Sequence, residues 1–532
     1  MKNYALFLVL LLFTSGYSEE VYDVVVYGGT SAGVIAAVQA AKMGKSVVLI
    51  ESSQHIGGMT SSGLGKIDTK NVDILGGLTR NYFHRVWKYY QHPQNWIWEK
   101  QPKSPPHQEM YVVEPHVAEK LFKQMAKEVS LRIELGERLN RKSGVHKKGA
   151  QIVEIAMESG RKFQGKMFID ATYVGDLMAA AGVSYTVGRE PNSHYHETLN
   201  GIHPYIQRAL SPGIDPYVIK GDPKSGLLPR IHPNAGGNPG DGDRGVQAYN
   251  FRLCLTKVAA NRIPIEKPIQ YKDSDYELIF RVLEASIPAY KIGILSNTIP
   301  NGKIDLNNSG LFSTDFVGMS WNYAEADYAE REKITLEHEN WQRGLLWTLQ
   351  NHPRISSKVH AFFAHWGLAK DEFPENHHWP YQLYVRESRR MVSDAVVTEN
   401  TVRGKDPPID DSIGLGAYPM DSHIVKYYVA PDGLIACDGT YYVGAAEPYR
   451  ISYRAIVPKA SECENLLVPV CLSASHAAYG SVRIESTFML LAQSAATAAC
   501  LAIDCAVPVQ KVPYETLRHH LLAEGQVLKW PR

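Results

Sequence analysis

The sequence predicts an α/β fold in which one domain contains a parallel sheet and an α+β domain is inserted into it. Three observations predict this architecture. Near the start of the chain, β-branched residues at 22–27 and 46–50 flank an alanine-rich segment of helical length, which is the pattern of two buried parallel strands joined by a helix. A further apolar strand pattern lies near the other end of the chain, at residues 465–470, and a long apolar helix pattern follows it. The mixed sequence between these two regions is therefore expected to form the inserted domain.

The overall composition is that of a globular protein with more than one core. Its 532 residues are too many for one ordinary domain, and 44% of them are hydrophobic, which is enough to bury two or three cores. Lys and Arg together number 56 and Asp and Glu together 55. Neither sign gathers into a long run, so we expect no nucleic-acid partner and no attraction to an anionic membrane.

The first 18 residues have the features of a secretory signal peptide. Lys2 gives a positive start, residues 5–13 form a short apolar run, and the small residues Gly16 and Ser18 precede a cleavage point before Glu19. The apolar run is shorter than the ~20 residues that span a bilayer. We expect an exported protein, periplasmic or secreted, without a stable membrane anchor. An uncleaved anchor or a buried first strand is the alternative interpretation.

The six cysteines do not make a disulfide scaffold in so long a chain, and no two of them form a Cys-x-x-Cys pair. An oxidising compartment would permit one or two bridges. Cys500 and Cys505 fall in one predicted helix at a spacing unsuited to bridging each other. We expect both to pack in the core.

The first predicted strand ends in a glycine-rich turn that suits a dinucleotide. Gly28 permits the tight turn, and Gly33 lets the following helix, residues 34–43, pack close to the strand. The free N–H groups at the start of that helix would face a pyrophosphate, because the helix dipole favours an anion there. The predicted cofactor contacts in this turn are Gly28, Gly29, Thr30, Ser31, Ala32 and Gly33.

Glu51 supports the same interpretation, since it follows the second predicted strand. A carboxylate at that position accepts both hydroxyls of an adenosine ribose and disfavours the 2′-phosphate of NADP. Thr30 stands where the usual pattern has its middle glycine, so the turn alone would be a weak motif. The complete unit of strand, turn, helix, strand and acid predicts a Rossmann-like dinucleotide-binding domain.

A second glycine-dense stretch, residues 55–65, favours FAD over NAD. It begins a few residues after Glu51, where an NAD-binding fold would normally continue into another helix. A backbone this bare can run flat against a long cofactor, although a flexible loop is the alternative interpretation. We expect FAD contacts from Gly57, Gly58, Met59 and Thr60.

Motifs along nearly the whole chain carry a resemblance to a known family. They include Gly76-Gly77-Leu78, Glu114-Pro115-His116, the segment from Val385 to Met391, Met420-Asp421-Ser422-His423 and the run from Asn465 to Ala499. Together with the glycine-rich turns, these segments resemble the exported bacterial FAD-dependent oxidoreductases of the glutathione-reductase-like flavoprotein superfamily. The resemblance implies a Rossmann-like FAD-binding domain with a parallel sheet, and an inserted α+β substrate domain.

The resemblance also implies that the chain returns to FAD after a small antiparallel excursion, here residues 132–166. Asp170, Ala171 and Thr172 match the family's Ala-Thr-Gly segment at that return. Tyr173 stands in place of the usual glycine, and Gly175 follows it.

A second return is implied near the other end of the chain. In similar proteins the strand at 465–470 meets the ribityl chain, and the next helix points its N-terminal amides at flavin N1 and the C2 carbonyl. Ser473 and Arg483 are the contacts implied here. The residues Cys471, Leu472 and Ser473 replace the acid that the family's wider pattern has at the strand end.

Three side chains are candidates for the chemistry beside the flavin, which needs mainly orientation and a group that transfers a proton. His476 lies where the resemblance places the chain beside the isoalloxazine ring, and an imidazole suits removal of an alcohol proton. His423 and Arg386 come next, the arginine as a clamp for a carboxylate or sugar hydroxyls if residues 385–396 are helical. The alternatives are a hydrogen-bonded structural histidine, and an ion-pair network of Arg386, Arg389 and Arg390 with Glu387 and Asp394.

No metal site is predicted. Clusters such as His194-Tyr195-His196-Glu197 and His377-His378 lack a third ligand at a recognised spacing, so we expect solvated loops. Residues 87–98 are rich in aromatic side chains, which stack on sugars in some proteins but more often pack in an interdomain core. Asn301, in a Pro-Asn-Gly-Lys turn, is a further candidate for a polar substrate contact.

These assignments lead to a function and to its alternatives. No second glycine-rich fingerprint follows a strand in the insertion, so we expect no NAD(P)H-binding domain, and electrons should come from the substrate itself or from an exported carrier. The redox partner is an unidentified electron acceptor or donor. The favoured function is hydride transfer between a small polar substrate, such as a sugar or hydroxy acid, and flavin N5. The alternatives are an NAD-dependent dehydrogenase, and a secreted polysaccharide-binding or polysaccharide-cleaving protein that keeps the fold without redox function. The predicted divisions are the signal peptide at 1–18, the first part of the FAD-binding domain at 19–187, the substrate or cap domain at 188–460, the returning FAD-binding segment at 461–510 and a C-terminal tail at 511–532.

Overall fold

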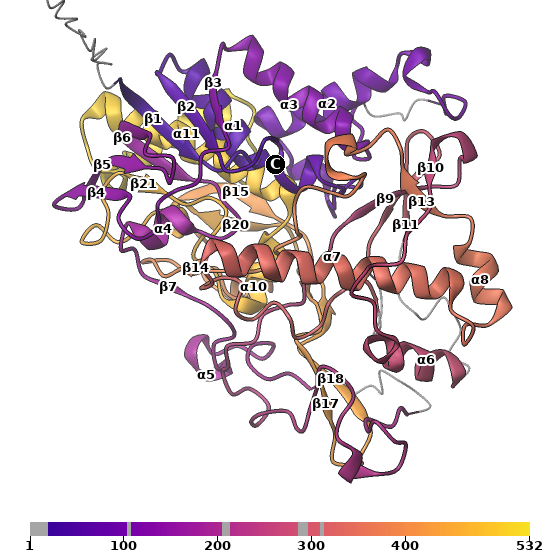
Figure 1. Ribbon diagram of the computed structural model, residues 1–532. Coiled ribbons are helices and arrows are strands. Elements are labelled where there is room, and N and C mark those ends of the chain that lie inside the picture. The colour runs from indigo at the N-terminus through magenta and orange to yellow at the C-terminus, as the bar shows by residue number, and fades with distance from the viewer. Residues whose placement is uncertain (1–19, 104–107, 205–212, 286–295, 309–312, 532) are drawn as a thin grey trace, which may run out of the picture.

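The structure is a computed structural model that describes residues 20–103, 108–204, 213–285, 296–308 and 313–531 (Figure 1). The predicted signal peptide lies outside these ranges. Indigo and purple elements from the N-terminal part of the chain lie beside yellow elements from the C-terminal part in the upper half of Figure 1. The magenta and orange elements between them in sequence lie mainly below them and to their right. The two ends of the chain therefore build one layered unit.

Seven strands form the sheet of this unit. They are β1 (Val21–Tyr27), β2 (Val47–Glu51), β3 (Arg132–Leu135), β4 (Val145–Lys148), β5 (Gln151–Ala156), β6 (Lys162–Asp170) and β21 (Leu466–Leu467). The order is β3-β2-β1-β6-β5-β4, and β21 also pairs with β6. β1 runs parallel to both β2 and β6, and β21 runs parallel to β6. The predicted α/β fold with a parallel sheet is confirmed.

The antiparallel excursion is shorter than the predicted residues 132–166. β3 pairs in parallel with β2, and only β4 and β5 run antiparallel to their neighbours. The reason is the connection before β3, which contains a helix, α3 (Pro115–Glu128). A helical crossover returns the chain in the same direction and so produces a parallel strand.

Two helices that are far apart in sequence pack against each other on this sheet, α1 (Ser31–Lys42) and α11 (Glu485–Cys505). Small buried residues on both, such as Ala36 and Ala495, permit the close approach. Within the described part of the chain, α11 alone is long and apolar enough to cross a membrane, but 83% of its apolar window is buried inside the protein. It is a core helix. Two further helices complete this unit, α2 (Gly77–Tyr90) and α12 (Tyr514–Ala523).

The insertion is built on a five-stranded antiparallel sheet of order β10-β13-β9-β12-β11 and on the long helix α7 (Tyr328–Asn351). The strands of that sheet are β9 (Leu253–Thr256), β10 (Arg262–Ile263), β11 (Ser296–Ile299), β12 (Lys303–Leu306) and β13 (Gly367–Ala369). A three-stranded sheet contains β8 (Ile231–His232), β17 (Lys426–Val429) and β18 (Ile435–Asp438). Three two-stranded sheets pair β7 (Tyr185–Thr186) with β14 (Arg390–Met391), β15 (Ser412–Gly416) with β20 (Tyr449–Ser452), and β16 (Met420–Ser422) with β19 (Tyr441–Val443). The remaining helices are α4 (Asp176–Ala180), α5 (Asn192–Tyr195), α6 (Glu277–Glu284), α8 (Ser357–Phe363), α9 (Glu399–Val402) and α10 (His476–Val482).

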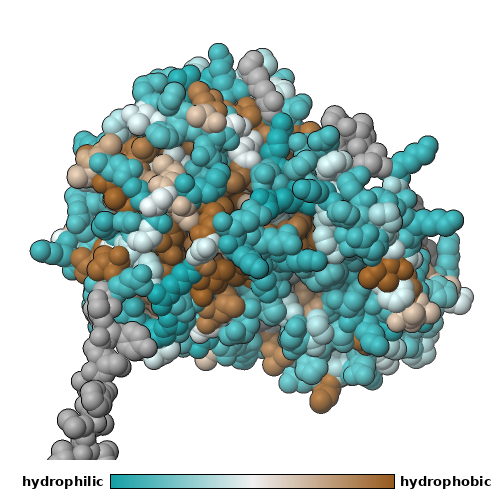
Figure 2. All heavy atoms as spheres, turned by 90° about the horizontal axis from the view of Figure 1, so that it is seen from above, coloured by the Kyte–Doolittle hydropathy of each residue, from teal (hydrophilic) through white to brown (hydrophobic). Residues whose placement is uncertain are grey.

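The cysteines and the surface add two observations. All six cysteines are free thiols. Cys505 is exposed rather than packed in the core, because the last turn of α11 faces solvent. Cys500 is buried as predicted. Hydrophilic side chains cover most of the face in Figure 2, with smaller apolar areas between them.

His338, in the middle of α7, leads to a prediction about pH. It is buried, its Nδ1 lies 2.7 Å from the Ile334 carbonyl oxygen, and burial lowers its pKa to about 4. The unfolded chain takes up this proton near pH 6.5, whereas the folded chain does so near pH 4. We therefore expect the free energy of unfolding to fall by about 3 kcal/mol as the pH is lowered from 6.5 to 4. Urea unfolding at a series of pH values measures this loss, which should be larger in the wild type than in His338→Gln. If the free energy of unfolding depends on pH equally in both proteins, the prediction is contradicted.

Candidate cofactor and active site

The glycines of the first turn are required by the backbone around them. Gly28 has a φ of +105°, and a Cβ there would lie 2.8 Å from the carbonyl carbon of Ala171. A Cβ on Gly33 would lie 1.8 Å from the carbonyl oxygen of Gly28. No side chain fits at either position, so β1, α1 and the end of β6 meet as closely as the dinucleotide-binding motif requires.

Thr30 has a structural role that a glycine would not provide. It is the N-cap residue of α1, where its Oγ1 accepts a hydrogen bond from the Gly33 N–H at 3.2 Å. The same hydroxyl donates to the Ala171 carbonyl oxygen at 2.8 Å. The replacement of the middle glycine therefore fastens the turn to the end of β6 and fixes the direction in which the helix begins.

Glu51 lies at the end of β2 beside this turn. One of its carboxylate oxygens accepts the Gly29 N–H at 2.6 Å, and the other accepts the Ser53 N–H at 2.7 Å. Glu51 lines a cavity of about 430 Å³ together with Gly28, Thr30 and Thr172. This is where the sequence places the adenosine half of a dinucleotide.

The second glycine-dense stretch is ordered against the first turn. The Gly57 N–H donates to the Gly29 carbonyl oxygen at 2.7 Å, and a 3₁₀ turn, Gly58–Ser61, follows. A Cβ on Gly58 would lie 2.4 Å from the Tyr173 hydroxyl. The alternative of a flexible loop is wrong, because this stretch is packed between α1 and residue 173.

Glu485, at the start of α11, was not among the predicted site residues. It is buried and joins three of the predicted cofactor segments: it accepts the Ser31 hydroxyl at 2.6 Å, the Thr60 hydroxyl at 3.0 Å and the Tyr173 hydroxyl at 2.8 Å. Tyr173 in turn accepts the Met59 N–H at 2.9 Å. Burial raises the pKa of Glu485. The signal that could have found it is a single acid at the start of an otherwise apolar helix.

Asp170 lies at the end of β6 and shapes the return of the chain. It is fully buried, accepts the Thr172 N–H at 3.0 Å and hydroxyl at 2.7 Å, and accepts the Met178 N–H at 2.8 Å. Burial raises its pKa to about 6. Ala171 N–H donates to the Tyr27 carbonyl oxygen at 2.8 Å. Asp170 and Ala171 therefore hold Thr172 at the wall of the 430 Å³ cavity.

Ser473, also predicted as a cofactor contact, lies away from both cavities described here. Its N–H donates to the Ala455 carbonyl oxygen at 2.8 Å, and its hydroxyl accepts the Ser393 N–H at 3.2 Å. It is completely buried and lines neither of the two cavities described here.

A larger cavity, of about 620 Å³, lies where the two domains meet, and it brings three of the predicted residues together. Arg483, just before α11, lines it with Arg386 and His423 from the insertion. Lys66, Asp68, Arg252, Tyr384, Asp421 and Tyr442 are among the other lining residues. A volume of this size suits a small-molecule site.

His423 is held by carboxylates on both sides of its ring. Its Nδ1 lies 2.8 Å from Asp315 Oδ2, and its Nε2 lies 3.5 Å from Asp421 Oδ2. The other oxygen of Asp315 accepts Arg386 Nη2 at 2.8 Å. Burial alone would raise the pKa of Asp421, but His423 and Arg483 lower it to about 2. Asn308 Nδ2 donates to Asp315 Oδ2 at 2.6 Å. An ionised Asp315 only accepts, so it also accepts a hydrogen bond from Nδ1–H, and the lone pair of the ring is then on Nε2.

Residues 385–396 are not helical, which corrects the arrangement expected for the arginines. Only β14 lies there, and the three arginines have separate partners. Arg389 pairs with Asp176 at 2.8 Å and with Glu325, and Arg390 pairs with Glu190 at 2.7 Å and with Glu387. The extended backbone of the preceding residues sends successive side chains in different directions. Only Arg386 of the three lines the 620 Å³ cavity.

His476 lies outside the lining of that cavity. Its side chain is fully buried, with Nδ1 at 2.8 Å from Glu387, and its N–H donates to Glu190 at 3.0 Å. The ring of Tyr441, which does line the cavity, has its centroid 6.5 Å from that of His476. A catalytic role for His476 stays a prediction, but the structure places His423, not His476, at the cavity wall.

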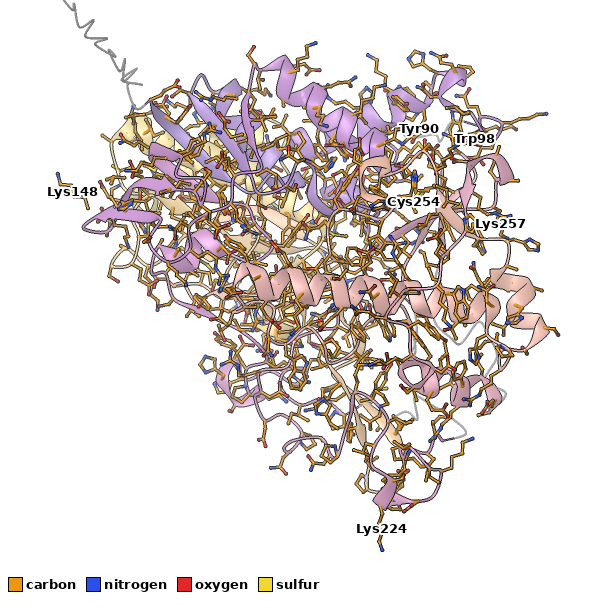
Figure 3. All side chains as sticks on the ribbon, in the orientation of Figure 1. Tyr90, Trp98, Lys148, Lys224, Cys254 and Lys257 are labelled. Carbon is orange, nitrogen blue, oxygen red and sulfur yellow. The ribbon has the colours of Figure 1, made fainter. Side chains whose placement is uncertain are left out.

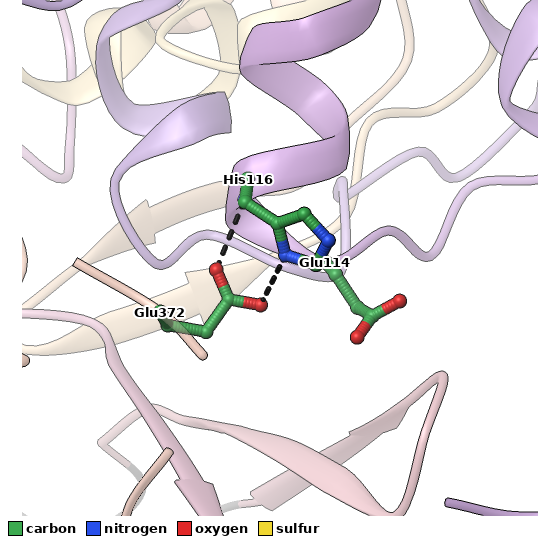
Figure 4. A group of neighbouring side chains, drawn as sticks. All are labelled: Glu114, His116 and Glu372. Atoms are coloured by element: carbon green, nitrogen blue, oxygen red, sulfur yellow. Dashed lines mark hydrogen bonds and ion pairs between the residues drawn. The ribbon is translucent and has the colours of Figure 1, made fainter. Parts of the chain in front are cut away.

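One group of side chains in the described residues has the composition of a metal site: Glu114, His116 and Glu372 (Figure 4). The ammonium of Lys303 already lies 2.7 Å from each of the two glutamates. It supplies the positive charge that the carboxylates need. Asn301, predicted as a substrate contact, belongs to this junction, since its side chain accepts the Ile97 N–H at 2.6 Å and donates to Glu114 at 2.8 Å.

The fold and the two cavities define a flavoprotein. The residues fit FAD on the observations above: two glycines that admit no Cβ, an acid at the end of β2, and a cavity beside the turn that begins α1. The chain belongs to the FAD dependent oxidoreductase family, whose model matches residues 23–521. The cofactor is FAD and the protein is an FAD-dependent oxidoreductase.

Comparison with individual proteins gives more limited similarities. A 3-oxosteroid 1-dehydrogenase of Mycolicibacterium smegmatis is 44% identical over 54 residues, which are 10% of this chain and 10% of that protein. L-proline dehydrogenase from P. horikoshii is 19% identical, with 32% of this chain and 59% of that chain covered and a TM-score of 0.23. A 3-ketosteroid-Δ4-(5α)-dehydrogenase from Rhodococcus jostii RHA1 is 16% identical, with 32% and 50% covered and a TM-score of 0.19.

Proposed function

We propose that the enzyme transfers a hydride between a small polar substrate, a sugar or a hydroxy acid, and flavin N5. The observation that carries this proposal is the 620 Å³ cavity, because it combines a positioned base with polar side chains beside the FAD-binding segments. Bound FAD accepts or gives the hydride. The residues of the chain orient the substrate and move the proton. The electron partner that restores the flavin is a separate acceptor or donor.

His423 is the proton-transferring group in this proposal. When an alcohol is oxidised, its C–H and O–H bonds break and a C=O bond forms. Bound FAD would take the hydride, and the proton passes to His423 Nε2. Asp315 holds the ring through Nδ1 at 2.8 Å and stabilises the imidazolium that forms. The ionised Asp421, 3.5 Å from Nε2, also favours the protonated ring.

The lining of the cavity favours a polar substrate over a steroid, the substrate class named for two of the similar proteins. Apart from Ile424 and Ile484, every lining side chain carries a polar group. A steroid would leave the groups of Arg386, Arg483 and Asn307 that have no partner in the described part of the chain without hydrogen bonds, which costs about 1–3 kcal/mol for each buried group. A sugar or hydroxy acid can bond to them.

The test is the reduction of the bound flavin. In His423→Gln we expect the rate of anaerobic flavin bleaching by the best sugar or hydroxy acid to fall on the order of a hundredfold, with FAD content unchanged. Stopped-flow absorbance measures it. His519→Gln, on the exposed helix α12, is the matched control and should keep the wild-type rate. If His476→Gln lowers the rate and His423→Gln does not, the assignment to His423 is wrong; if no sugar or hydroxy acid bleaches the flavin, the proposed reaction fails.

A further inference from the structure

Two arginines that line the 620 Å³ cavity belong to one network of polar side chains. Arg386, Asp315, His423, Asp421 and Arg483 form a chain of contacts of 2.8, 2.8, 3.5 and 3.4 Å in that order. Both ends of the chain are arginines. Each of the two carboxylates is therefore shared between two basic side chains.

The other basic and acidic side chains at the cavity, among the described residues, are Arg252, Lys66 and Asp68. Arg252 is matched by Asp305, at 2.8 Å from its Nε, so that this pair is neutral. Lys66 and Asp68 add one base and one acid. Burial raises the pKa of Asp68. An anion in this cavity would meet the guanidinium groups of Arg386 and Arg483.

The two arginines also have hydrogen-bonding capacity to spare. Within the described part of the chain, Arg386 Nε and Nη1 and Arg483 Nε are buried and have no hydrogen-bond partner. Both guanidinium groups lie against the ring of Tyr384, at 4.4 and 5.9 Å from its centroid. A guanidinium group is suited to a carboxylate in both charge and shape.

Other lining groups are suited to hydroxyls and to a sugar ring. Asn307 has a buried amide oxygen without a partner among the described residues, and Asn297 and Thr440 lie in the same wall. The rings of Tyr418 and Tyr442 form an edge-to-face pair, with centroids 6.3 Å apart, and Tyr442 is 60% exposed. Exposed tyrosine rings of this kind stack on sugar faces.

We propose that the substrate is a sugar acid, whose carboxylate binds between Arg386 and Arg483 while its hydroxyls contact the amide and hydroxyl side chains of the same wall. This rests on the proposed function, because it names the substrate class of that site. The carboxylate is a handle and does not react. The oxidised group is a hydroxyl within reach of His423.

The experiment compares acids with neutral counterparts on the full-length, FAD-loaded protein. D-glucuronate, D-galacturonate and D-gluconate are titrated by calorimetry beside glucose, galactose and glucuronamide, the uncharged isostere of glucuronate. We expect at least one acid to bind about tenfold or more tightly than its neutral counterpart. Equal affinity for acid and neutral forms, or no binding of any acid, overturns the proposal without any variant being needed.

Two variants then locate the carboxylate. Arg386→Gln and Arg483→Lys should each weaken binding of the preferred acid by about tenfold or more and leave the affinity for neutral sugars within twofold. Arg518→Gln, an exposed arginine of α12 that pairs with Glu515, is the matched control and should bind as the wild type does. Wild-type affinity for the acid in both cavity variants overturns the assignment of these arginines.

The binding titrations and the anaerobic flavin-bleaching measurements together separate this inference from the proposed reaction. Arginine-dependent binding of an acid that never bleaches the flavin in the absence of oxygen would refute the reaction and leave the ligand class. Bleaching by neutral sugars as fast as by acids would refute the ligand class and leave the reaction.

Discussion

Gly33→Ala is expected to yield a protein that folds but does not retain FAD. The added Cβ would lie 1.8 Å from the Gly28 carbonyl oxygen, which is a backbone atom and cannot rotate away. Carbon and oxygen need about 3 Å, so α1 must move outward by about 1 Å or more. A displacement of this size at a binding group costs about a hundredfold. We therefore expect FAD affinity to fall at least that much, measured as flavin absorbance after purification and by titration of apoprotein with FAD.

Gly444→Ala is the matched control for this experiment. A Cβ at Gly444 meets nothing within 4 Å, and the backbone there is not in the left-handed region. It should bind FAD as the wild type does. A circular dichroism spectrum shows whether Gly33→Ala has folded. Wild-type FAD content and affinity in a folded Gly33→Ala protein would show that close packing at this turn is not what positions the cofactor.

Lys303→Met is expected to lower the free energy of unfolding by about 3–5 kcal/mol. The Lys303 ammonium is fully buried and lies 2.7 Å from both Glu114 and Glu372, which are themselves almost wholly buried. Burial alone would lower the pKa of Lys303, but the surrounding carboxylates raise it, so the group is charged. Without the ammonium, Glu114 would remain buried without a cation, and Glu372 would keep only His116, whose Nδ1 lies 2.8 Å away. Urea unfolding followed by tryptophan fluorescence measures the effect.

The position of this cluster explains why the effect should be large. Glu114 immediately precedes α3 of the FAD-binding domain, whereas Lys303 begins β12 of the insertion. Tyr90, which donates to Glu114 at 2.8 Å, and Cys254 lie in the same region of the molecule in Figure 3. The ion pairs of Lys303 therefore link the FAD-binding domain to the insertion.

Two comparisons make this prediction decisive. Lys333→Met removes an exposed lysine of α7 that pairs with Glu330 at 3.3 Å, and it should change the free energy of unfolding by no more than about 0.5 kcal/mol. Adding Glu372→Gln to Lys303→Met should recover part of the loss, because one uncompensated charge is removed. A loss below about 1 kcal/mol in Lys303→Met, or no recovery in the double variant, would contradict the role assigned to charge.

The cofactor side of the protein could be predicted from sequence because its determinants are local. Gly28, Gly33 and Glu51 lie within one strand-turn-helix-strand unit, and backbone geometry dictates each of them. Glu485 escaped prediction although it lies in the same site. It meets Ser31 from 454 positions away in sequence, and nothing in a local pattern reports a contact of that kind.

The substrate side could be predicted only in part. His423 and Arg386 were candidates, but for Arg386 the reason was a helix that does not exist. Their partner Asp315 was not predicted, since it lies more than 70 residues from either in sequence and is joined to them at 2.8 Å by the fold alone. The sequence favoured His476 over His423 as the proton-transferring residue. Only the tertiary structure shows that His423 lines the cavity and that His476 is buried outside its lining.

The sequence by itself determined the α/β class, the dinucleotide-binding unit at residues 21–51 and FAD as the cofactor. These follow from hydrophobic period, glycine positions and one acid, all of which act over a few residues. Only the tertiary structure decided which polar residues share a cavity and which arginines keep hydrogen-bond donors free for a ligand. Such choices depend on burial and on contacts between distant segments, because a charge acts on whatever the fold places within a few ångströms of it.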